Sequence, residues 1–170
     1  GVRDLHSLRR TGDLILIVPS ERRLSGTFLA AADLLDPMIE VSAGIVFSRG
    51  KVLCTRKGES RYGYLSHRYE FPGGKLESGE TPVDALIREF GEELKADIRG
   101  DSIIPLPVVD YDYPDFSVRI HPFVIRADDL EVQLTEHEDQ SWLPINELRG
   151  IEWIAADELI VNELEGLFLG

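Results

Sequence analysis

Residues 74–96, GKLESGETPVDALIREFGEELKA, constrain the fold more than any other part of the chain. Thr81 can cap a helix, Pro82 suits the first helical position, and Asp84 places a negative charge in the first turn. The segment therefore predicts a helix that begins near Thr81 and ends near Leu94, preceded by a glycine-rich turn.

The predicted helix has an apolar side and an acidic side. Apolar residues recur at intervals of three and four and should face a core; they are Val83, Leu86, Ile87, Phe90 and Leu94. Glu89, Glu92 and Glu93 fall together on an adjoining side, where like charges cost roughly 0.2 to 0.5 kcal/mol per pair. A divalent cation would reverse that penalty, and oxygen-only ligands suit Mg²⁺ or Mn²⁺. An ordinary solvated acidic face is the alternative.

The chain is acidic throughout, with 31 Asp and Glu against 18 Lys and Arg and a formal net charge of −13. This charge disfavours duplex nucleic acid and anionic membrane surfaces as partners, because both are bound through Lys and Arg. It would also repel a free nucleotide, so a nucleotide substrate should arrive as a metal complex and meet local basic groups. No membrane-spanning run or signal peptide is recognised, and we expect a cytoplasmic protein.

The order of elements predicts an α+β domain. Two strands joined by the turn at residues 48–50 should open it, and Cys54 should be buried in the second strand without a disulfide partner. Helices and strands mixed in this order favour a mixed sheet covered by helices on both faces. The expected elements after the first helix are strands at 103–113, 116–126, 131–134 and 142–143, and a closing helix at 157–167.

We assign residues 38–170 to this domain and treat residues 1–37 as an N-terminal arm of uncertain role. Residues 14–18 are strand-like and residues 27–35 are helix-like. The arm could dock on the domain, exchange with a partner subunit in a homodimer, or be the remnant of another domain.

The spacing of Gly74, Glu80, Arg88-Glu89 and Glu92-Glu93 resembles the Nudix box, the signature of the Nudix hydrolases. Three further segments, RYEFPGG, DYDYPDF and WIAAD, resemble MutT and CTP pyrophosphohydrolases, so the likeness spans roughly residues 39–167. The chain departs from the pattern at Lys95, where the family has glycine after the helix. Lysine must either adopt a left-handed conformation at some cost or end the helix differently.

The resemblance implies the Nudix fold, an α/β/α sandwich, and a Mg²⁺-dependent hydrolase, with Mn²⁺ as the alternative cation. The residues that it places at the metal are the Gly73 carbonyl, Glu89, Glu92 and Glu93. Arg88 would orient the glutamates during catalysis, and Gly74 and Glu80 would support the loop. Glu136, six residues before Trp142, would bind metal or activate water, although a loop carboxylate without a function is the alternative. His137 beside it is either a proton acceptor or an exposed loop histidine.

Three residues are candidates for substrate binding, each with a plain alternative. Lys75 could meet a phosphate or be a solvated lysine, and Arg56 could approach the nucleotide or be a strand-end charge. The resemblance implies that Asp157 recognises the base edge by hydrogen bonding, but its position also suits a helix N-cap. Tyr113 and Phe116 could stack on a base or belong to the core.

The implied reaction is hydrolysis of a nucleoside triphosphate to the monophosphate and pyrophosphate. CTP or dCTP and an oxidised purine such as 8-oxo-dGTP are the expected substrates. Two alternatives stay open at this point. The enzyme could hydrolyse another nucleoside diphosphate derivative, such as ADP-ribose or a dinucleoside polyphosphate, or the fold could serve as a non-catalytic, nucleotide-binding regulatory module.

Overall fold

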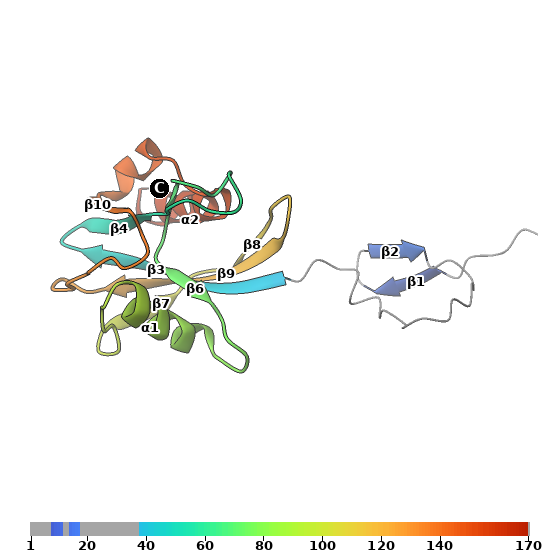
Figure 1. Cartoon of the computed structure of the whole chain (residues 1–170), viewed down its shortest axis with the longest axis horizontal. Helices are drawn as coiled ribbons and strands as arrows, with labels where there is room; N and C mark the ends of the chain where they lie inside the picture. The colour runs from blue at the N-terminus through green and yellow to red at the C-terminus, as the bar shows by residue number, and fades with distance from the viewer. Residues whose placement is uncertain (1–7, 12–13, 18–37, 170) are drawn as a thin grey trace, which may run out of the picture. The chain divides into compact units, whose positions relative to one another are not determined.

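A computed structural model describes residues 8–11, 14–17 and 38–169 of the chain (Figure 1). The chain forms two compact units, residues 1–35 and 36–170. In the first unit, β1 (Leu8–Thr11) and β2 (Leu14–Ile17) pair in an antiparallel hairpin. The strand expected at residues 14–18 is thus present as β2, while the helix expected at 27–35 lies outside the described residues.

In the second unit, eight strands of the described residues form one mixed sheet in which β10, β4, β3, β9 and β7 follow one another. Strand β5 adds to β4, β6 to β3 and β8 to β9. Only β3 and β9 are parallel among these pairs, with Met38 opposite Ser117 and Phe47 opposite Arg126. The strands are β3 (Met38–Ser48), β4 (Lys51–Arg56), β5 (Tyr69–Glu70), β6 (Gly73–Lys75), β7 (Ser102–Pro105), β8 (Val109–Asp112), β9 (Ser117–Arg126) and β10 (Asp139–Leu143).

Helices cover both faces of this sheet, which confirms the predicted fold class. Helix α1 (Pro82–Glu93) packs on one face and α2 (Ala155–Phe168) on the other, and a 3₁₀ helix, η2 (Ile145–Gly150), precedes α2 (Figure 1). Successive residues of β3 point to opposite faces, so Val46 joins the core under α1 and Ile45 the core under α2. Cys54 is fully buried in the core under α2, as predicted, and burial raises the pKa of its thiol to about 12.

The predicted start and end of α1 are confirmed. The Thr81 hydroxyl accepts a hydrogen bond from the Asp84 N–H at 3.2 Å, and Pro82 is the first helical residue. After the helix, Lys95 takes a left-handed conformation with φ of 53°. The lysine therefore performs the turn that glycine makes more easily, and its Nζ donates to the Glu92 carbonyl at 3.1 Å.

Two strand predictions were wrong in detail. The segment expected as one strand at 103–113 is divided into β7 and β8, which both pair with β9. Pro105 and Pro107 explain the break, because proline has no N–H to donate. Residues 131–134 form no strand; instead, the Gln133 N–H donates to the Leu94 carbonyl at 2.7 Å at the end of α1. In the described part of the chain, no helix is long and apolar enough to cross a membrane.

Candidate active site

A cavity of about 660 Å³ opens where β3, the turn into β6, helix α1 and the start of α2 meet. The loop at residues 57–65 and the hairpin between β8 and β9 complete its wall. Two groups of lining residues stand out. The carboxylate cluster consists of Glu70, Glu89, Glu93 and Glu136. The aromatic cluster consists of Tyr62, Tyr113 and Phe116.

Arg88 organises the polar side of α1. Its guanidinium donates to both carboxylate oxygens of Glu80, at 2.9 and 3.0 Å, and to the Lys75 carbonyl at 2.9 Å. It also donates to Glu89 Oε1 at 2.8 Å and to Glu92 Oε2 at 3.2 Å. Hydrogen bonding to Arg88 lowers the pKa of Glu80, and the bond to Glu80 is the main reason that the pKa of Arg88 is raised. The Arg88 guanidinium therefore fixes the glycine turn and helix α1 relative to each other.

The two glycines of the turn are required by close packing. A Cβ on Gly74 would lie 2.3 Å from the Glu89 Cδ, and one on Gly73 would lie 2.0 Å from the Ser42 carbonyl oxygen. Gly73 also has a φ of 154°, which side chains rarely adopt. The missing side chain of Gly74 therefore leaves the space that the Glu89 carboxylate occupies at the cavity wall.

The three helix glutamates do not share one environment. Glu89 and Glu93 line the cavity, whereas the Glu92 side chain is 60% exposed and lies outside the lining. Glu93 Oε2 is buried without a hydrogen-bond partner. Burial raises the pKa of Glu93 to about 7, and the charges of Glu89, Glu70 and Glu136 add to this shift while His137 opposes it. The carboxylate cluster therefore contains a buried acid, Glu93, whose ionisation is opposed by the charges of the other three members.

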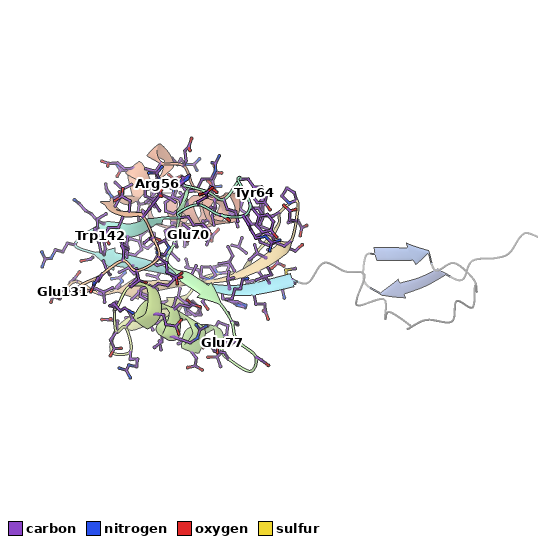
Figure 2. The ribbon with its side chains drawn as sticks, in the orientation of Figure 1. Arg56, Tyr64, Glu70, Glu77, Glu131 and Trp142 are labelled. Carbon is purple, nitrogen blue, oxygen red and sulfur yellow. The ribbon has the colours of Figure 1, made fainter. Side chains whose placement is uncertain are left out.

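Glu136 lies in the cavity wall. It directly follows residues 133–135, whose backbone is hydrogen-bonded to the end of α1. His137 next to it is not an exposed loop histidine, because only 5% of its side chain is accessible. Its Nε2 lies 3.1 Å from Oε1 of Glu70, a residue of the carboxylate cluster. Glu70 is labelled in Figure 2. Sequence reasoning did not single out Glu70, although the residue lies within the RYEFPGG segment that carries the resemblance.

Asp157 is buried in the cavity wall with 3% of its surface exposed. The N-cap of α2 is Ile154, so Asp157 lies inside the helix and the N-cap alternative is wrong. Its Oδ2 accepts the Phe71 N–H at 2.7 Å. Burial, with the charge of Glu70, raises the pKa of Asp157 to about 8, so the carboxyl is largely protonated at neutral pH.

The structure places Lys57, rather than Arg56, in the cavity wall. Arg56, labelled in Figure 2, is not among the lining residues. Its Nε donates to the His67 carbonyl at 2.9 Å and pairs with Glu138 at 3.2 Å. Side chains at consecutive positions of an extended chain point to opposite sides, so Lys57, which directly follows β4, takes the place expected for Arg56. The basic residues that line the cavity are Lys57, Arg61 and Lys75.

The aromatic cluster spans two separate segments. Tyr62, on the loop after β4, lies with its ring centroid 5.3 Å from that of Phe116. Tyr113 lies 5.0 Å from Phe116 and stacks on Tyr64 at 5.5 Å, and its hydroxyl accepts the Ala156 N–H at 3.0 Å. Tyr113 and Phe116 pack against the core under α2 as well as lining the cavity, and Tyr113 lies beside Asp157.

A comparison with known families agrees with this geometry. Residues 38–167 match the model of the NUDIX domain family, which covers well over half of the chain. The chain belongs to the NUDIX domain family. It is thus a Nudix hydrolase, an enzyme that acts on phosphoric anhydrides, and its fold and MutT-like character are as the Nudix box predicted.

One relative and two solved structures share nearly their whole length with this Nudix domain. The 8-oxo-dGTP diphosphatase of Escherichia coli K12 is 25% identical over 130 residues, which cover 76% of this chain and 98% of the relative. The solution structure of a MutT Nudix hydrolase from methicillin-resistant Staphylococcus aureus 252 is 36% identical, with a TM-score of 0.57 over 78% of this chain and 99% of that one. The MutT crystal structure from Methanosarcina mazei is 22% identical with a TM-score of 0.65, over 76% and 93%.

Nudix hydrolases generally use divalent metals, and the donors of this site suit one. The oxygen-only carboxylate cluster and the unpartnered buried oxygen of Glu93 match the preference of hard cations. Within the described residues, no three Asp, Glu, His or Cys side chains converge closely enough to form a complete binding site as they stand. The site is thus chemically suited to a cation, although its side chains must still turn toward one another.

Proposed function

We propose that this Nudix hydrolase cleaves a nucleoside triphosphate to the monophosphate and pyrophosphate, with Mg²⁺ as its cation and Mn²⁺ as a substitute. One observation carries the proposal: a single cavity joins a carboxylate cluster, three basic residues and an aromatic cluster beside a buried acid. These are the groups that a metal-bound triphosphate and a base would each require.

Glu89 and Glu93, with the Gly73 carbonyl and Glu136, would hold the cation; Glu92 would join them only by leaving Arg88. When bound, the cation neutralises phosphate charge and makes water more acidic. Arg88 keeps Glu89 oriented toward the cavity, as its 2.8 Å hydrogen bond indicates.

The remaining groups would act on the substrate and the attacking water. Glu136 would accept the proton of the water, since it lies in the cavity wall. Lys57, Arg61 and Lys75 would offset the phosphate charge that the acidic chain repels.

For the base, we propose an oxidised purine, 8-oxo-dGTP, as the preferred substrate and CTP or dCTP as the second choice. Asp157 supports recognition of a base edge, because its carboxyl is buried in the cavity and is protonated more readily than an ordinary aspartate. Such a group can donate as well as accept a hydrogen bond. The 8-oxo-dGTP diphosphatase of E. coli, similar over nearly its full length, supports the choice of purine.

A substrate panel with product identification tests the proposal. The purified protein is incubated with Mg²⁺ and 8-oxo-dGTP, dGTP, CTP, dCTP, ADP-ribose or a dinucleoside polyphosphate, and products are separated by ion exchange. We expect 8-oxo-dGMP and pyrophosphate to form fastest. Preferential cleavage of ADP-ribose, without pyrophosphate, would replace the proposed substrate class. Nucleotide binding without turnover at any metal concentration would instead indicate a regulatory module.

A further inference from the structure

The segment that carries Glu136 is attached to the domain on both sides of that residue. On one side, the Thr135 N–H donates to the Glu93 carbonyl at 3.0 Å, and the Thr135 hydroxyl contacts the Glu92 and Glu93 carbonyls at 3.2 and 3.0 Å. On the other side, the Glu138 N–H donates to the Arg56 carbonyl at 3.0 Å. Only Glu136 and His137 lie between these two attachments.

His137 supplies a third attachment through its side chain. The imidazole is almost fully buried, and Nε2 lies 3.1 Å from Glu70 Oε1. Because the Glu70 carboxylate accepts hydrogen bonds, Nε2 carries the hydrogen and donates it. Nδ1 is buried without a partner, so the bond to Glu70 is the polar contact that orients the ring.

Glu70 is a firm anchor for this bond. It belongs to β5, where it pairs with Thr55 of β4, and the Thr55 hydroxyl donates to its carbonyl at 2.9 Å. The Lys57 Nζ lies 3.5 Å from the same Oε1 that His137 contacts. The side chain is therefore held in place while it lines the cavity.

We propose that His137 is a positioning residue whose hydrogen bond to Glu70 holds Glu136 at the cavity and thereby sets the affinity of the carboxylate cluster for a divalent cation. The inference rests on the proposed function, in which Glu136 is a metal ligand. Replacing a residue that orients a metal ligand without binding the metal itself commonly lowers metal affinity by about 10- to 100-fold. His137 is suited to this role because it follows Glu136 directly in the chain and its ring is held by Glu70.

Three substitutions of His137 separate hydrogen bonding from packing. In His137→Gln the amide nitrogen can reach the place of Nε2, whereas in His137→Asn the same amide is too short and reaches only the place of Nδ1. His137→Leu removes the donor altogether. Binding of Mn²⁺ without nucleotide is followed by the loss of the free-ion signal in electron paramagnetic resonance, so the readout does not depend on turnover.

We expect His137→Asn and His137→Leu to weaken Mn²⁺ binding by about 10- to 100-fold and His137→Gln to recover most of the affinity. Adding Glu136→Gln to His137→Asn should then weaken binding little beyond the effect of Glu136→Gln alone, because both act on one ligand. Equal affinities of the Gln and Asn variants, or fully additive effects of the two changes, would overturn the inference.

The Gln and Asn variants decide the question even where His137→Leu fails to fold, since both keep a polar amide. Circular dichroism melting of each variant checks that the comparison is made on folded protein. Failure of the proposed function gives a different result: the unaltered protein would then bind Mn²⁺ with the predicted dependence on His137 but release no pyrophosphate from any nucleotide. An unaltered protein that does not bind Mn²⁺ would also overturn the role of His137.

Discussion

The carboxylate cluster and the aromatic cluster line the same cavity but are held in different ways. Glu89 and Glu93 lie on a capped helix and Glu70 lies on a paired strand, and Arg88 donates to Glu89. Glu136 lies on an irregular segment that backbone hydrogen bonds of Thr135 and Glu138 attach to the domain. The rings meet by stacking, and Tyr62 is carried by a loop. Directional polar bonds therefore position the groups for chemistry, while adjustable apolar contacts surround the part of the cavity assigned to the base.

The largest effect is expected at the carboxylate cluster. Glu89→Gln should lower kcat by about 10²- to 10³-fold, because it removes a carboxylate that would hold the cation, and the cation neutralises the charge of the reacting phosphates. The free energy of unfolding should change little. Glu163→Gln, the same replacement on the exposed side of α2, is the control, and steady-state kinetics with urea unfolding measures both. A fall in kcat of less than tenfold would mean that Glu89 has no part in the reaction.

A subtler change at the same cluster moves Glu89 without removing its charge. Gly74→Ala places a Cβ where the Glu89 carboxylate now lies, and such a displacement should lower kcat by roughly 10- to 100-fold. Gly91→Ala is the matched control, since no atom lies within 4 Å of its added Cβ. This control should keep kcat and stabilise helix α1 by about 0.5 to 1 kcal/mol. An unchanged kcat in Gly74→Ala would show that the position of Glu89 is not critical.

At the aromatic cluster the effect should fall on KM rather than kcat. Tyr62→Ala removes a ring that lies on a loop, and about 1 kcal/mol of lost stacking would raise KM for the nucleotide roughly fivefold. Tyr62→Phe keeps the ring and should keep KM. If Tyr62→Ala lowered kcat as strongly as Glu89→Gln, the division of the cavity into chemical and recognition groups would be incorrect.

A further effect, on stability rather than on kinetics, concerns the two buried acids, Asp157 and Glu93, and depends on pH. The pKa of Asp157 is raised from 3.8 to about 8 and that of Glu93 from 4.5 to about 7. Between the ordinary and the raised pKa of each group, the folded protein therefore binds more protons than the unfolded protein. The free energy of unfolding therefore falls as pH rises, by at most about 1.4 kcal/mol per pH unit for each group. Above pH 7 the loss should come mainly from Asp157.

Urea unfolding at pH 5, 6, 7 and 8 measures this dependence. Asp157→Asn, which cannot titrate, should flatten the decline between pH 7 and 8, while Glu93→Gln should flatten it mainly below pH 7. Identical pH profiles for the Asn variant and the unaltered protein would show that Asp157 is ionised in the folded state. The two variants thus separate the electrostatics of the recognition side from those of the carboxylate cluster.

Local signals in the sequence were sufficient for much of the fold. Thr81 and Pro82 mark the start of α1, and the turn at residues 48–50 marks the hairpin of β3 and β4, because capping and turn geometry depend on adjacent residues. The segment at 131–134 was misread as a strand. Its alternating apolar residues pack under α1, but its backbone binds the end of that helix, a partner far away in sequence.

Prediction of the site had the same limit. The Nudix box identifies Arg88 and the helix glutamates, yet spacing alone could not show that Glu92 lies outside the cavity lining. The aromatic cluster and the His137–Glu70 bond join segments that only the folded sheet brings together. Arg56 and Lys57 differ by one position, and the direction of each side chain depends on where β4 ends.

The parallel pairing of β3 with β9 has a consequence for biosynthesis. The first strand of the domain must wait for residues 117–126 to leave the ribosome before the middle of the sheet can close. Until then, β3 presents a long unpaired edge that contains the apolar run of residues 43–47. A nascent chain whose residues 117–126 are still inside the ribosome should therefore depend on chaperones, whereas one in which these residues have emerged can form its central pair.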